Sequence, residues 1–532
     1  MKQHVVTFIV SVLLSGVAFG QQQLTNSKAS QKMMVALYAL RSMYVDKVDE
    51  NKLVEDGLKA MIKNLDPHSA YMTADEMKEM NEPLQGGFDG IGISFNMMND
   101  TLFIIEVIPG GPSEKVGLLP GDRIIFVNDE SVAGVKMTSN DVIKRLKGPK
   151  GTEVKVSVKR RNHDALLDFK IVRDKIPIYS LDASFMVDKN TGYIRLSRFG
   201  ATTLDEFKSA LSELKKSGMK QLILDLESNG GGYLSAAIDL ADEFLAKGRS
   251  IVYTEGANAR RRDNFASDKG SFENGKLILL IDEYSASASE ILSGAIQDWD
   301  RGIVLGRRSF GKGLVQQPLP LPDGSVLKLT VARYFTPSGR FIQKPYDNME
   351  NYSKDLIERY NRGEMTNSDN IHFPDSLKTF TLQNKRTIYG GGGIMPDVFI
   401  PLDTTKMSSL YKTLSSAGII NKFSMKYVDE NRKKLKDNYP KIDDFVKNFN
   451  ADEALYNRLI AFAKEEKIAL KDSDLVADNK LLMKQLKAYM ARDLGKSSDY
   501  FKVMWTENES LVKAIEIINN NKSYEEILNR RK

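Results

Sequence analysis

Between residues 176 and 343, strand-like runs alternate with helix-like runs, and this alternation constrains the fold more than any other feature of the chain. GYIRLS, QLILDL and KLILLID are each followed by a run with apolar residues at helical spacing. Repeated β–α units of this kind predict an α/β domain with a largely parallel sheet. Ligand sites in such sheets lie beyond the carboxyl ends of the strands, where the turns ESNGGG and SASAS fall.

The segments on either side of this domain have a different character. Residues 21–83 carry apolar residues at helical spacing up to Asp66-Pro67, which predicts an N-terminal helical region. Residues 84–175 contain short β-like runs separated by Gly, Pro and Asp, which predicts a small β-rich module. Residues 402–532 are rich in Lys, Asn and Asp and predict a helical C-terminal region. A chain of 532 residues is long enough for about three or four such domains.

The first twenty residues are typical of a secretory signal peptide. Lys2 is followed by an apolar run over residues 5–17 and then by Ala18-Phe19-Gly20, which predicts cleavage before Gln21. The apolar run is short for a membrane span, which needs roughly 20 residues, and no later segment reaches that length. We therefore expect export to the periplasm, with an uncleaved membrane anchor as the alternative.

Composition excludes several kinds of site. There is no cysteine, which excludes thiol nucleophiles and thiolate metal sites, and the sequence holds only His4, His68, His163 and His372. These histidines lack the spacing of a zinc motif, so we expect no metal ion and no cofactor. The net charge of +6 comes without a basic stripe interleaved with aromatic residues, so nucleic acid is not an expected partner.

The stretch GRRSFGKG, residues 306–313, is close to a phosphate-binding loop but departs from it. Gly306, Gly311 and Lys312 fit the pattern, whereas Gly313 stands where a serine or threonine should hold magnesium. A helix should follow this loop, but the next residues run into prolines. Lys312 therefore needs a role other than nucleotide binding.

The turn SASAS offers a nucleophile that such a lysine could serve. Its serines stand at the start of a predicted helix, where free N–H groups and the helix dipole suit a developing oxyanion. A desolvated lysine has a lowered pKa and can act as the base of a Ser-Lys pair. Taken alone, however, Ser287 to Glu290 also matches a helix capping box, and GKG also matches a tight turn with a solvated lysine. Spacing by itself does not decide between these interpretations.

Together these segments resemble the C-terminal processing peptidases, also called tail-specific proteases. The resemblance covers about residues 35–400, through LDPHSAYM, GGFDGIGISF, LILDLESNGGGYL, SASASEILSGAIQDWDRGIVLGRRSFGKGLVQ and ARYFTPSGRFIQ. YGGGGIMPD and the long helical tail resemble the Bacteroidetes-type members. The resemblance implies a multi-domain α/β fold with a ClpP/crotonase-like protease core over residues 176–401. It also implies an inserted PDZ domain over residues 84–175 and helical N- and C-terminal regions.

The resemblance also implies a catalytic constellation. The nucleophile falls on Ser287 and the general base on Lys312, and Gln316 would orient the lysine amine by hydrogen bonding. No cofactor or metal is implied.

The oxyanion hole implied by the family consists of two backbone amides. One is that of Ala288 and the other belongs to the glycine turn, at Gly231 or Gly232. Glu227 and Gly230 stand where the family has arginine and proline, which leaves the choice of glycine open.

The PDZ resemblance implies a site for a free C-terminus. The amides of Ile91, Gly92 and Ile93 would receive the terminal carboxylate, and the tail would add as a strand along ISF. The helix SNDVIKRLK would form the other wall of an apolar pocket. The alternative is a module that only supports the protease.

The expected function is that of a periplasmic serine endopeptidase that recognises protein C-termini and cuts upstream with a Ser-Lys dyad. The alternatives are a non-hydrolytic PDZ scaffold or holdase, and a Ser-His hydrolase that uses His163 or His372. The expected partners are proteins with flexible or unfolded C-termini. An adaptor protein, a homodimer and peripheral membrane association are left open.

Overall fold

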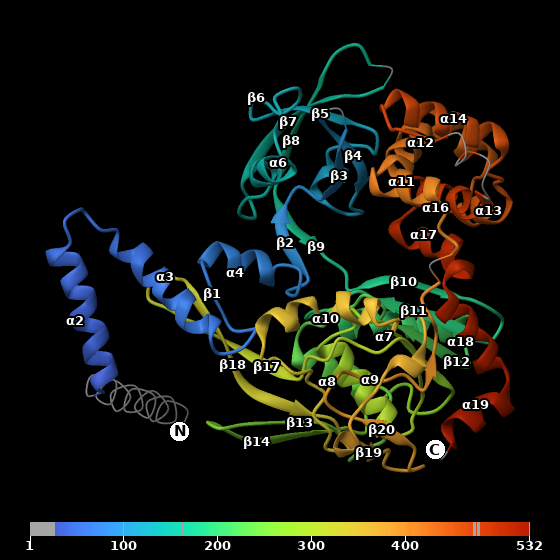
Figure 1. Cartoon of the computed structure of the whole chain (residues 1–532). Coiled ribbons are helices and arrows are strands. Elements are labelled where there is room, and N and C mark those ends of the chain that lie inside the picture. Colours follow the sequence, from blue (N-terminus) through green and yellow to red (C-terminus); the bar gives the residue numbers. More distant parts are fainter. Residues whose placement is uncertain are drawn as a thin grey trace, which may run out of the picture. The chain divides into compact units, whose positions relative to one another are not determined.

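The computed structural model of the chain describes residues 27–98, 100–161, 163–403, 405–471, 475 and 479–530. The predicted signal peptide, residues 1–20, lies outside the described residues. The chain forms two compact units, one that combines the segment up to Ala74 with Gln316–Thr330 and one that contains the rest. Figure 1 labels the helices and strands of both.

The first unit holds the two predicted N-terminal helices. The side chain of Ser27 caps α2 and the side chain of Asp49 caps α3, each by accepting a backbone N–H from the first turn. Helix α3 ends three residues before Asp66, which confirms the predicted stop. Strand β1 pairs antiparallel with the beginning of β18. The elements are α2 (Lys28–Met43), α3 (Glu50–Lys63), β1 (Ala70–Met72), β17 (Leu314–Pro320) and β18 (Val326–Phe335), the last two shared with the second unit.

The predicted β-rich module forms an antiparallel sheet in the order β3-β4-β5-β7-β8, with β6 beside β5 and a separate β2–β9 pair. The predicted helix SNDVIKRLK is present as α6, capped by a reciprocal Thr138–Asp141 capping box. The elements are α4 (Ala74–Asn81), β2 (Gly87–Gly90), β3 (Ile93–Met98), β4 (Thr101–Val107), α5 (Pro112–Lys115), β5 (Arg123–Val127), β6 (Glu130–Ser131), α6 (Ser139–Leu146), β7 (Glu153–Lys159), β8 (Leu167–Val172) and β9 (Asp174–Pro177).

The α/β domain has a six-stranded sheet in the order β10-β11-β12-β15-β16-β21, parallel except at its β10 edge, which confirms the predicted architecture. Helices α7, α8 and α9 pack on one face through a single apolar core. The elements are β10 (Leu181–Met186), β11 (Thr191–Leu196), α7 (Thr203–Lys216), β12 (Gln221–Asp225), α8 (Leu234–Asp242), β15 (Leu277–Ile281), α9 (Ala288–Asp298), β16 (Ile303–Gly306) and β21 (Val398–Phe399).

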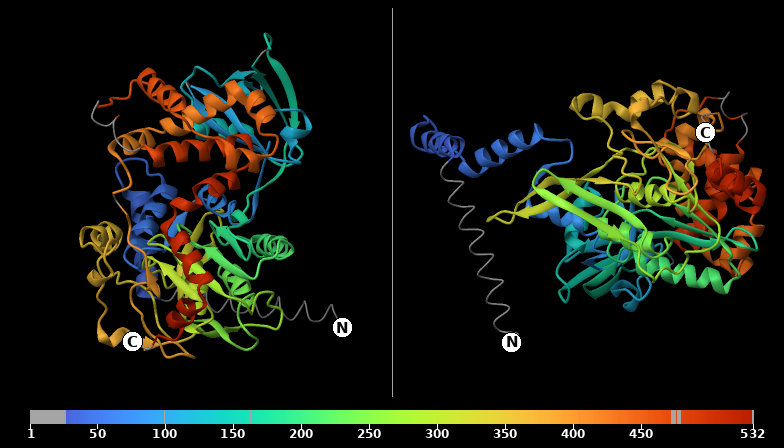
Figure 2. Two further views of the ribbon diagram at one scale, coloured as in Figure 1. Left: turned by 90° about the vertical axis from the view of Figure 1, so that its right-hand side faces the viewer. Right: turned by 90° about the horizontal axis from the view of Figure 1, so that it is seen from below.

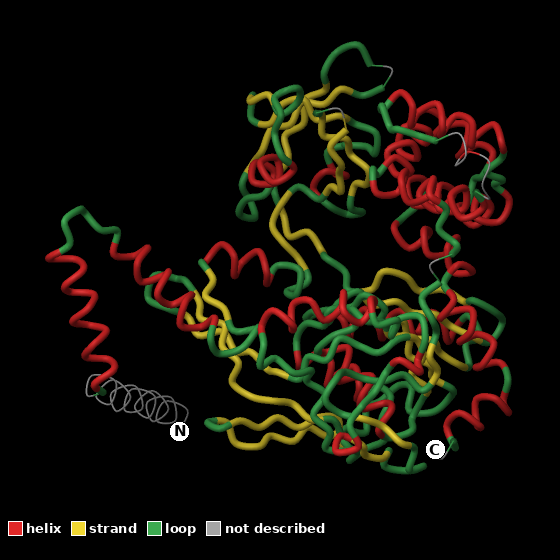
Figure 3. Tube along the Cα trace, viewed as in Figure 1, coloured by secondary structure: helices red, strands yellow, loops and turns green. Residues whose placement is uncertain are grey.

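A second, antiparallel layer follows from β13 (Ser250–Gly256) and β14 (Ala259–Phe265), with β13 pairing the end of β18. The irregular segment after β18 contains helix α10 (Met349–Asn361) and a small β-hairpin. Figure 3 distinguishes these helices and strands from the loops that join them. The remaining elements of the segment are β19 (Lys378–Phe380) and β20 (Thr387–Tyr389).

The C-terminal region divides in a way that the sequence did not indicate. Its first helices form a core of their own, centred on Phe423, Phe445 and Leu486. The last two helices instead cover the second face of the α/β sheet (Figure 2), where Leu511 and Ile518 join the same core as the strands. The elements are α11 (Ser409–Ser416), α12 (Ile419–Asn438), α13 (Ile442–Asn448), α14 (Glu453–Glu465), α16 (Lys480–Leu494), α17 (Ser497–Met504), α18 (Glu509–Asn519) and α19 (Asn521–Leu528).

Alternation of side chains explains why both faces of the sheet need cover. In β12, Leu222 and Leu224 join the α7–α9 core whereas Ile223 joins the α18–α19 core, and all three are fully buried. A parallel strand buried on both faces is a continuous apolar run, as QLILDL is. The last helices are therefore an integral part of the α/β domain.

We predict that Tyr524→Phe loosens the start of β15. The Tyr524 hydroxyl is buried, donates to the carbonyl oxygen of Leu277 and accepts its N–H, both at 3.1 Å. Losing these partners in a buried place costs about 1–3 kcal/mol. Amide hydrogen exchange at Leu277 should therefore become faster. The control is Val512→Ala, at an exposed side chain on α18, which should leave this exchange rate unchanged. An unchanged exchange rate at Leu277 in Tyr524→Phe would show that α19 does not stabilise the start of β15.

Candidate active site

The structure assigns different surroundings to the three serines of SASAS. The hydroxyl of Ser285 donates to the carbonyl oxygen of Leu226, and that of Ser289 donates to the carbonyl oxygen of Asn229, both at 2.8 Å. Both of these serines are fully buried, whereas Ser287 is partly exposed. Ser287 is thus the serine of the three that a substrate can approach.

The backbone at Ser287 is strained. Its φ of 56° and ψ of −110° lie outside the regions that L-residues ordinarily occupy, a conformation that costs of order 1–3 kcal/mol. Ser287 is also the N-cap residue of α9, and its N–H donates to the Glu290 side chain, but the N–H of Glu290 donates to the Ser287 carbonyl oxygen and the Ser287 hydroxyl makes no capping hydrogen bond. The Tyr334 hydroxyl donates to the Ser287 carbonyl oxygen at 3.2 Å. Capping and nucleophilic roles do not exclude each other, because the cap places the serine at the positive end of the helix.

The glycine turn reaches the candidate nucleophile at Gly231. A Cβ atom added at Gly231 would lie 2.9 Å from both the Cβ of Ser287 and the backbone nitrogen of Ala288. A Cβ at Gly232 would instead overlap the carbonyl oxygen of Phe199. The structure therefore brings Gly231 and Ala288 together beside Ser287. The Gly231 N–H itself donates to the Asn229 side chain at 2.9 Å.

Asn229 joins the glycine turn to the serine turn, a role that sequence reasoning missed. Its carbonyl oxygen accepts the Ala286 N–H at 3.0 Å as well as the Ser289 hydroxyl. Its side chain donates to the carbonyl oxygen of Leu196 on β11 and accepts the Gly231 N–H. The two turns at the carboxyl ends of β12 and β15 are thus held as one piece.

Glu290 links the candidate nucleophile to the candidate base. One carboxylate oxygen accepts the N–H of Ser287 at 2.8 Å and the N–H of Lys312 at 2.9 Å. The other accepts the N–H of Gly311 at 2.6 Å and the hydroxyl of Ser309 at 2.5 Å. Glu290 is fully buried, and this burial raises its pKa against the opposing effect of the hydrogen bonds. The backbones at Ser287 and Lys312 therefore meet at a single oxygen atom.

This contact also explains why residues 306–313, here called the lysine loop, look like a phosphate-binding loop. Its backbone N–H groups at Gly311 and Lys312 converge on an anion, as those of a phosphate loop do. The anion here is the chain's own Glu290. Phe310 completes the junction by donating its N–H to the carbonyl oxygen of Ser285 at 3.0 Å.

Comparison with known proteins identifies the family. The chain is 36% identical over 355 residues to the carboxy-terminal-processing protease of Bartonella bacilliformis, with 64% of this chain and 81% of that protein covered. Residues 190–348 match the model of peptidase family S41. The chain belongs to peptidase family S41, the serine-type C-terminal processing peptidases.

Further comparisons cover the other domains of this S41 peptidase. Carboxy-terminal processing protease CtpB of Bacillus subtilis is 34% identical over 332 residues, 62% of this chain and 68% of that protein. A solved PDZ domain of the carboxy-terminal protease from Vibrio cholerae, in complex with a peptide, is 37% identical with a TM-score of 0.16 and covers 17% of this chain and 97% of that one. The other matching family models are a PDZ domain at residues 79–159, the N-terminal domain of the activating protease CtpB at residues 15–76, and a family of unknown function at residues 410–495.

Gln316 lies in the first unit of the S41 peptidase, in a network with the LDPHS segment. Its side-chain nitrogen donates to the Thr330 hydroxyl, which donates to Asp66, both at 3.0 Å. Burial by itself would raise the pKa of Asp66, but hydrogen bonds from Ser69, His68 and Thr330 hold it below its ordinary value. The motif at the end of α3 thus fixes the surroundings of Gln316.

Glu227, which stands where the resemblance implies an arginine, is an unusual carboxyl group. Burial and the neighbouring carboxylates of Asp225 and Asp282 raise its pKa to about 7. Asn508, the N-cap of α18, donates to it at 2.7 Å. Glu227 therefore joins the C-terminal helices to the strand that leads into the glycine turn.

The PDZ domain contains a groove of about 770 Å³ between β3 and α6. The three residues of the predicted carboxylate site, Ile91, Gly92 and Ile93, line it together with Phe95 and Ile143. Gly92 has a φ of 77°, a conformation that favours glycine. The structure thus brings the predicted loop and helix together around one cavity.

Among the described residues, neither histidine of the alternative hydrolase forms a hydrogen bond with Ser287. His372 lines a cavity around Gln297, which lies ten positions further along α9 than Ser287, or about 15 Å along the helix axis. His163 lies in the β-rich module, next to Arg160. Among the described residues there is no cluster of three His, Asp or Glu side chains suited to a metal ion, and no helix with the length and hydrophobicity of a membrane span.

We predict a pH-dependent stability that depends on Glu227. Its pKa is about 7 in the folded chain and about 4.3 when unfolded, so the folded state holds the proton more tightly. Stability should therefore fall as pH rises between these two values and level off above pH 7. Thermal unfolding between pH 5 and pH 8 should show this slope in the wild type and a smaller slope in Glu227→Gln.

The exposed Glu213 on α7 provides the control, because Glu213→Gln should leave the slope unchanged. Identical slopes in the wild type and Glu227→Gln would show that Glu227 does not carry the effect.

Proposed function

We propose that this S41 peptidase is a periplasmic endopeptidase that recognises protein C-termini through its PDZ domain and cuts upstream with Ser287 and Lys312. The observation that carries the proposal is the shared Glu290 oxygen, which accepts both the Ser287 N–H and the Lys312 N–H. A nucleophile and a base whose backbones are fixed to one atom are pre-organised for reaction.

In the proposed mechanism, the Ser287 hydroxyl attacks the scissile carbonyl carbon while the Lys312 amine takes its proton. The amine then gives the proton to the leaving nitrogen as the C–N bond breaks. In the second half, Lys312 takes a proton from a water molecule that attacks the Ser287 ester carbonyl, and returns it to the Ser287 oxygen as the acyl–oxygen bond breaks. The tetrahedral oxyanion is held by the N–H of Ala288 and an N–H of the Gly231–Gly232 turn. Ala288 supports this role as the first residue of α9, where the N–H groups lack partners within the helix. Gln316 is the residue to which the family resemblance gives the role of orienting the lysine amine.

The PDZ groove selects the substrate in this proposal. The tail pairs with β3 as an added strand, its carboxylate meets the amides of residues 91–93, and its last side chain enters the groove near Phe95 and Ile143. The apolar walls favour apolar tail residues. Proteins with flexible or unfolded C-termini are the substrates, because a folded terminus cannot extend along a strand.

The sequence alone supports the periplasmic location and the Bacteroidetes-type lineage in this proposal. Residues 1–20 read as a cleavable signal peptide, and the YGGGGIMPD segment resembles Bacteroidetes-type members. Fractionation of cells that express the chain with and without residues 1–20 tests the periplasmic location. Recovery of both forms in the same fraction would contradict it.

We predict that Ser287→Ala and Lys312→Met abolish cleavage to a similar extent, because residues of one catalytic unit fail together. The loss should be at least about a thousandfold in kcat for an unstructured protein with an apolar tail. Labelling with a fluorophosphonate should disappear in Ser287→Ala.

The matched controls are Ser217→Ala and Lys216→Met, both exposed at the end of α7. Full cleavage by Ser287→Ala would refute the assignment of the nucleophile. If the unmutated chain binds C-terminal tails but does not cleave them, it is a scaffold or holdase instead.

We predict that amidation of the substrate's C-terminus lowers kcat/KM by about tenfold to a hundredfold, because hydrogen bonds to a charged group contribute about 1.5–3 kcal/mol. The measurement compares two peptides that differ only in this group, and acetylation of the N-terminus serves as the control. Equal hydrolysis of acid and amide would mean that the PDZ groove does not select the tail.

A further inference from the structure

Arg359 on α10 is among the largest fully buried side chains of the described residues, with 1% of its surface exposed. A buried guanidinium is expensive unless several partners satisfy it. Burial and the neighbouring Arg308 lower its pKa to about 10, so it stays charged at neutral pH. The contacts of Arg359 therefore need an explanation.

Those contacts are the backbone carbonyls of the lysine loop. The guanidinium donates to the carbonyl oxygen of Ser309 at 2.9 Å and to that of Phe310 at 3.2 Å. Its Nε atom pairs with Asp355, one helical turn earlier, at 3.1 Å. Arg359 thus binds the two residues that lie three and two positions before Lys312.

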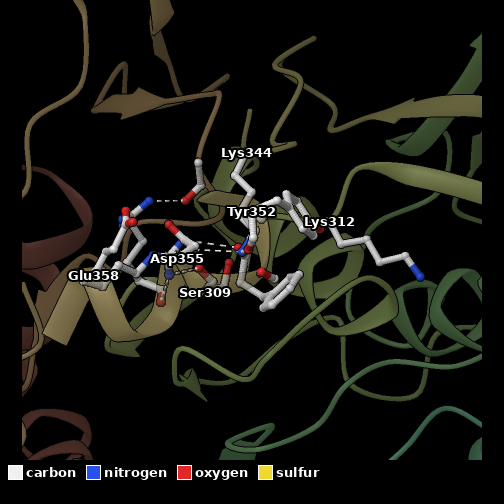
Figure 4. Close-up of polar contacts among 12 residues, drawn as sticks. Ser309, Lys312, Lys344, Tyr352, Asp355 and Glu358 are labelled. Carbon is white, nitrogen blue, oxygen red and sulfur yellow. Dashed lines mark hydrogen bonds and ion pairs between the residues drawn. The ribbon is translucent and has the colours of Figure 1, made fainter. Parts of the chain in front are cut away.

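Lys344 extends the same contact. Its N–H donates to the carbonyl oxygen of Gly311 at 3.0 Å, and its side chain donates to Asp355 at 2.8 Å. The ammonium lies 4.0 Å from the centre of the Phe310 ring and 4.3 Å from that of Tyr352. Figure 4 shows this cluster, with the Lys312 side chain extending away from it.

The lysine loop is therefore held from two sides by opposite charges. Glu290 accepts the N–H groups of Gly311 and Lys312, whereas Arg359 donates to the carbonyl oxygens of Ser309 and Phe310, so the Phe310–Gly311 peptide group is bound at both ends. An anion can bind only the donors of a backbone and a guanidinium only its acceptors. The two contacts together restrict both rotation and translation of this stretch.

We propose that Arg359 is a positioning residue for catalysis: it fixes the backbone of the lysine loop and thereby sets where the Lys312 amine stands relative to Ser287. The inference rests on the proposed function of that pair. Lysine has a flexible four-carbon stem, so the position of its amine depends on a rigid backbone. A displacement of about 1 Å at a catalytic group can cost about a hundredfold in rate.

The test compares Arg359→Lys with the wild type. Lysine keeps the charge but lacks the planar fork that donates to two carbonyls at once. We expect kcat to fall by about tenfold to a hundredfold with KM and tail-peptide binding unchanged. The acid limb of the kcat–pH profile should also move, because the surroundings of the Lys312 amine change.

Lys354→Met is the matched control. Lys354 lies on the same helix, is more than half exposed and pairs only on the surface with the exposed Glu350. We expect wild-type kcat and an unchanged pH profile from it. Asp355→Asn, which removes the shared carboxylate behind Arg359 and Lys344, should shift kcat and its pH profile in the same direction as Arg359→Lys.

The outcomes separate this inference from the proposed function. A folded Arg359→Lys variant with wild-type kcat and pH profile overturns the positioning role, while Ser287→Ala still tests the dyad independently. A loss of activity that only follows the folded fraction, with unchanged kcat per folded molecule, also overturns it. Full activity in Ser287→Ala would instead refute the proposed Ser287–Lys312 dyad, on which this inference rests.

Discussion

The buried carboxylate of Glu290 is the interaction on which the rest of the site depends. It accepts four hydrogen bonds, three of them from backbone N–H groups on two different loops. Each of these donors would cost about 1–3 kcal/mol if it were buried without a partner. A carboxylate buried without hydrogen-bond donors would be costly. Glu290 therefore requires that the serine turn and the lysine loop both hold their N–H groups against it, which fixes these two segments relative to each other. The strained backbone at Ser287 persists because these contacts over-determine it.

Around that carboxylate, the protein uses elements far apart in the chain to hold short irregular segments. The parallel sheet brings the glycine and serine turns to one edge, and Asn229 joins them. Helix α10 supports the lysine loop from behind through Arg359. Helix α18 covers the second face of the sheet and contacts Glu227 through its N-cap, Asn508. Rigid scaffolding of loops that carry chemistry is a common arrangement in α/β enzymes, because loops alone do not hold atoms to within a fraction of an ångström.

Much of the architecture could be predicted because its signals are local. The runs GYIRLS, QLILDL and KLILLID became β11, β12 and β15, and SNDVIKRLK became α6, each from a periodicity that spans only a few residues. The family resemblance directed attention to Ser287 and Lys312, and the structure brings their backbones together. The roles of Asn229, Glu290 and Arg359 could not be predicted in the same way. The partners that give them these roles lie 19–60 residues away in the chain, and no local pattern encodes such a pairing, although the short-range Ser287–Glu290 contact matches the capping-box pattern.

The sequence by itself determined the α/β alternation, the absence of thiol chemistry and the placement of serines at the start of a helix. These properties follow from composition and short-range periodicity, which exist before the chain folds. Only the tertiary structure decided which of the three serines is exposed, that Gly231 rather than Gly232 adjoins it, and that a carboxylate of the chain occupies the loop that resembles a phosphate site. Exposure and hydrogen-bond partners depend on which distant segments meet, and the packing of the whole domain settles that question.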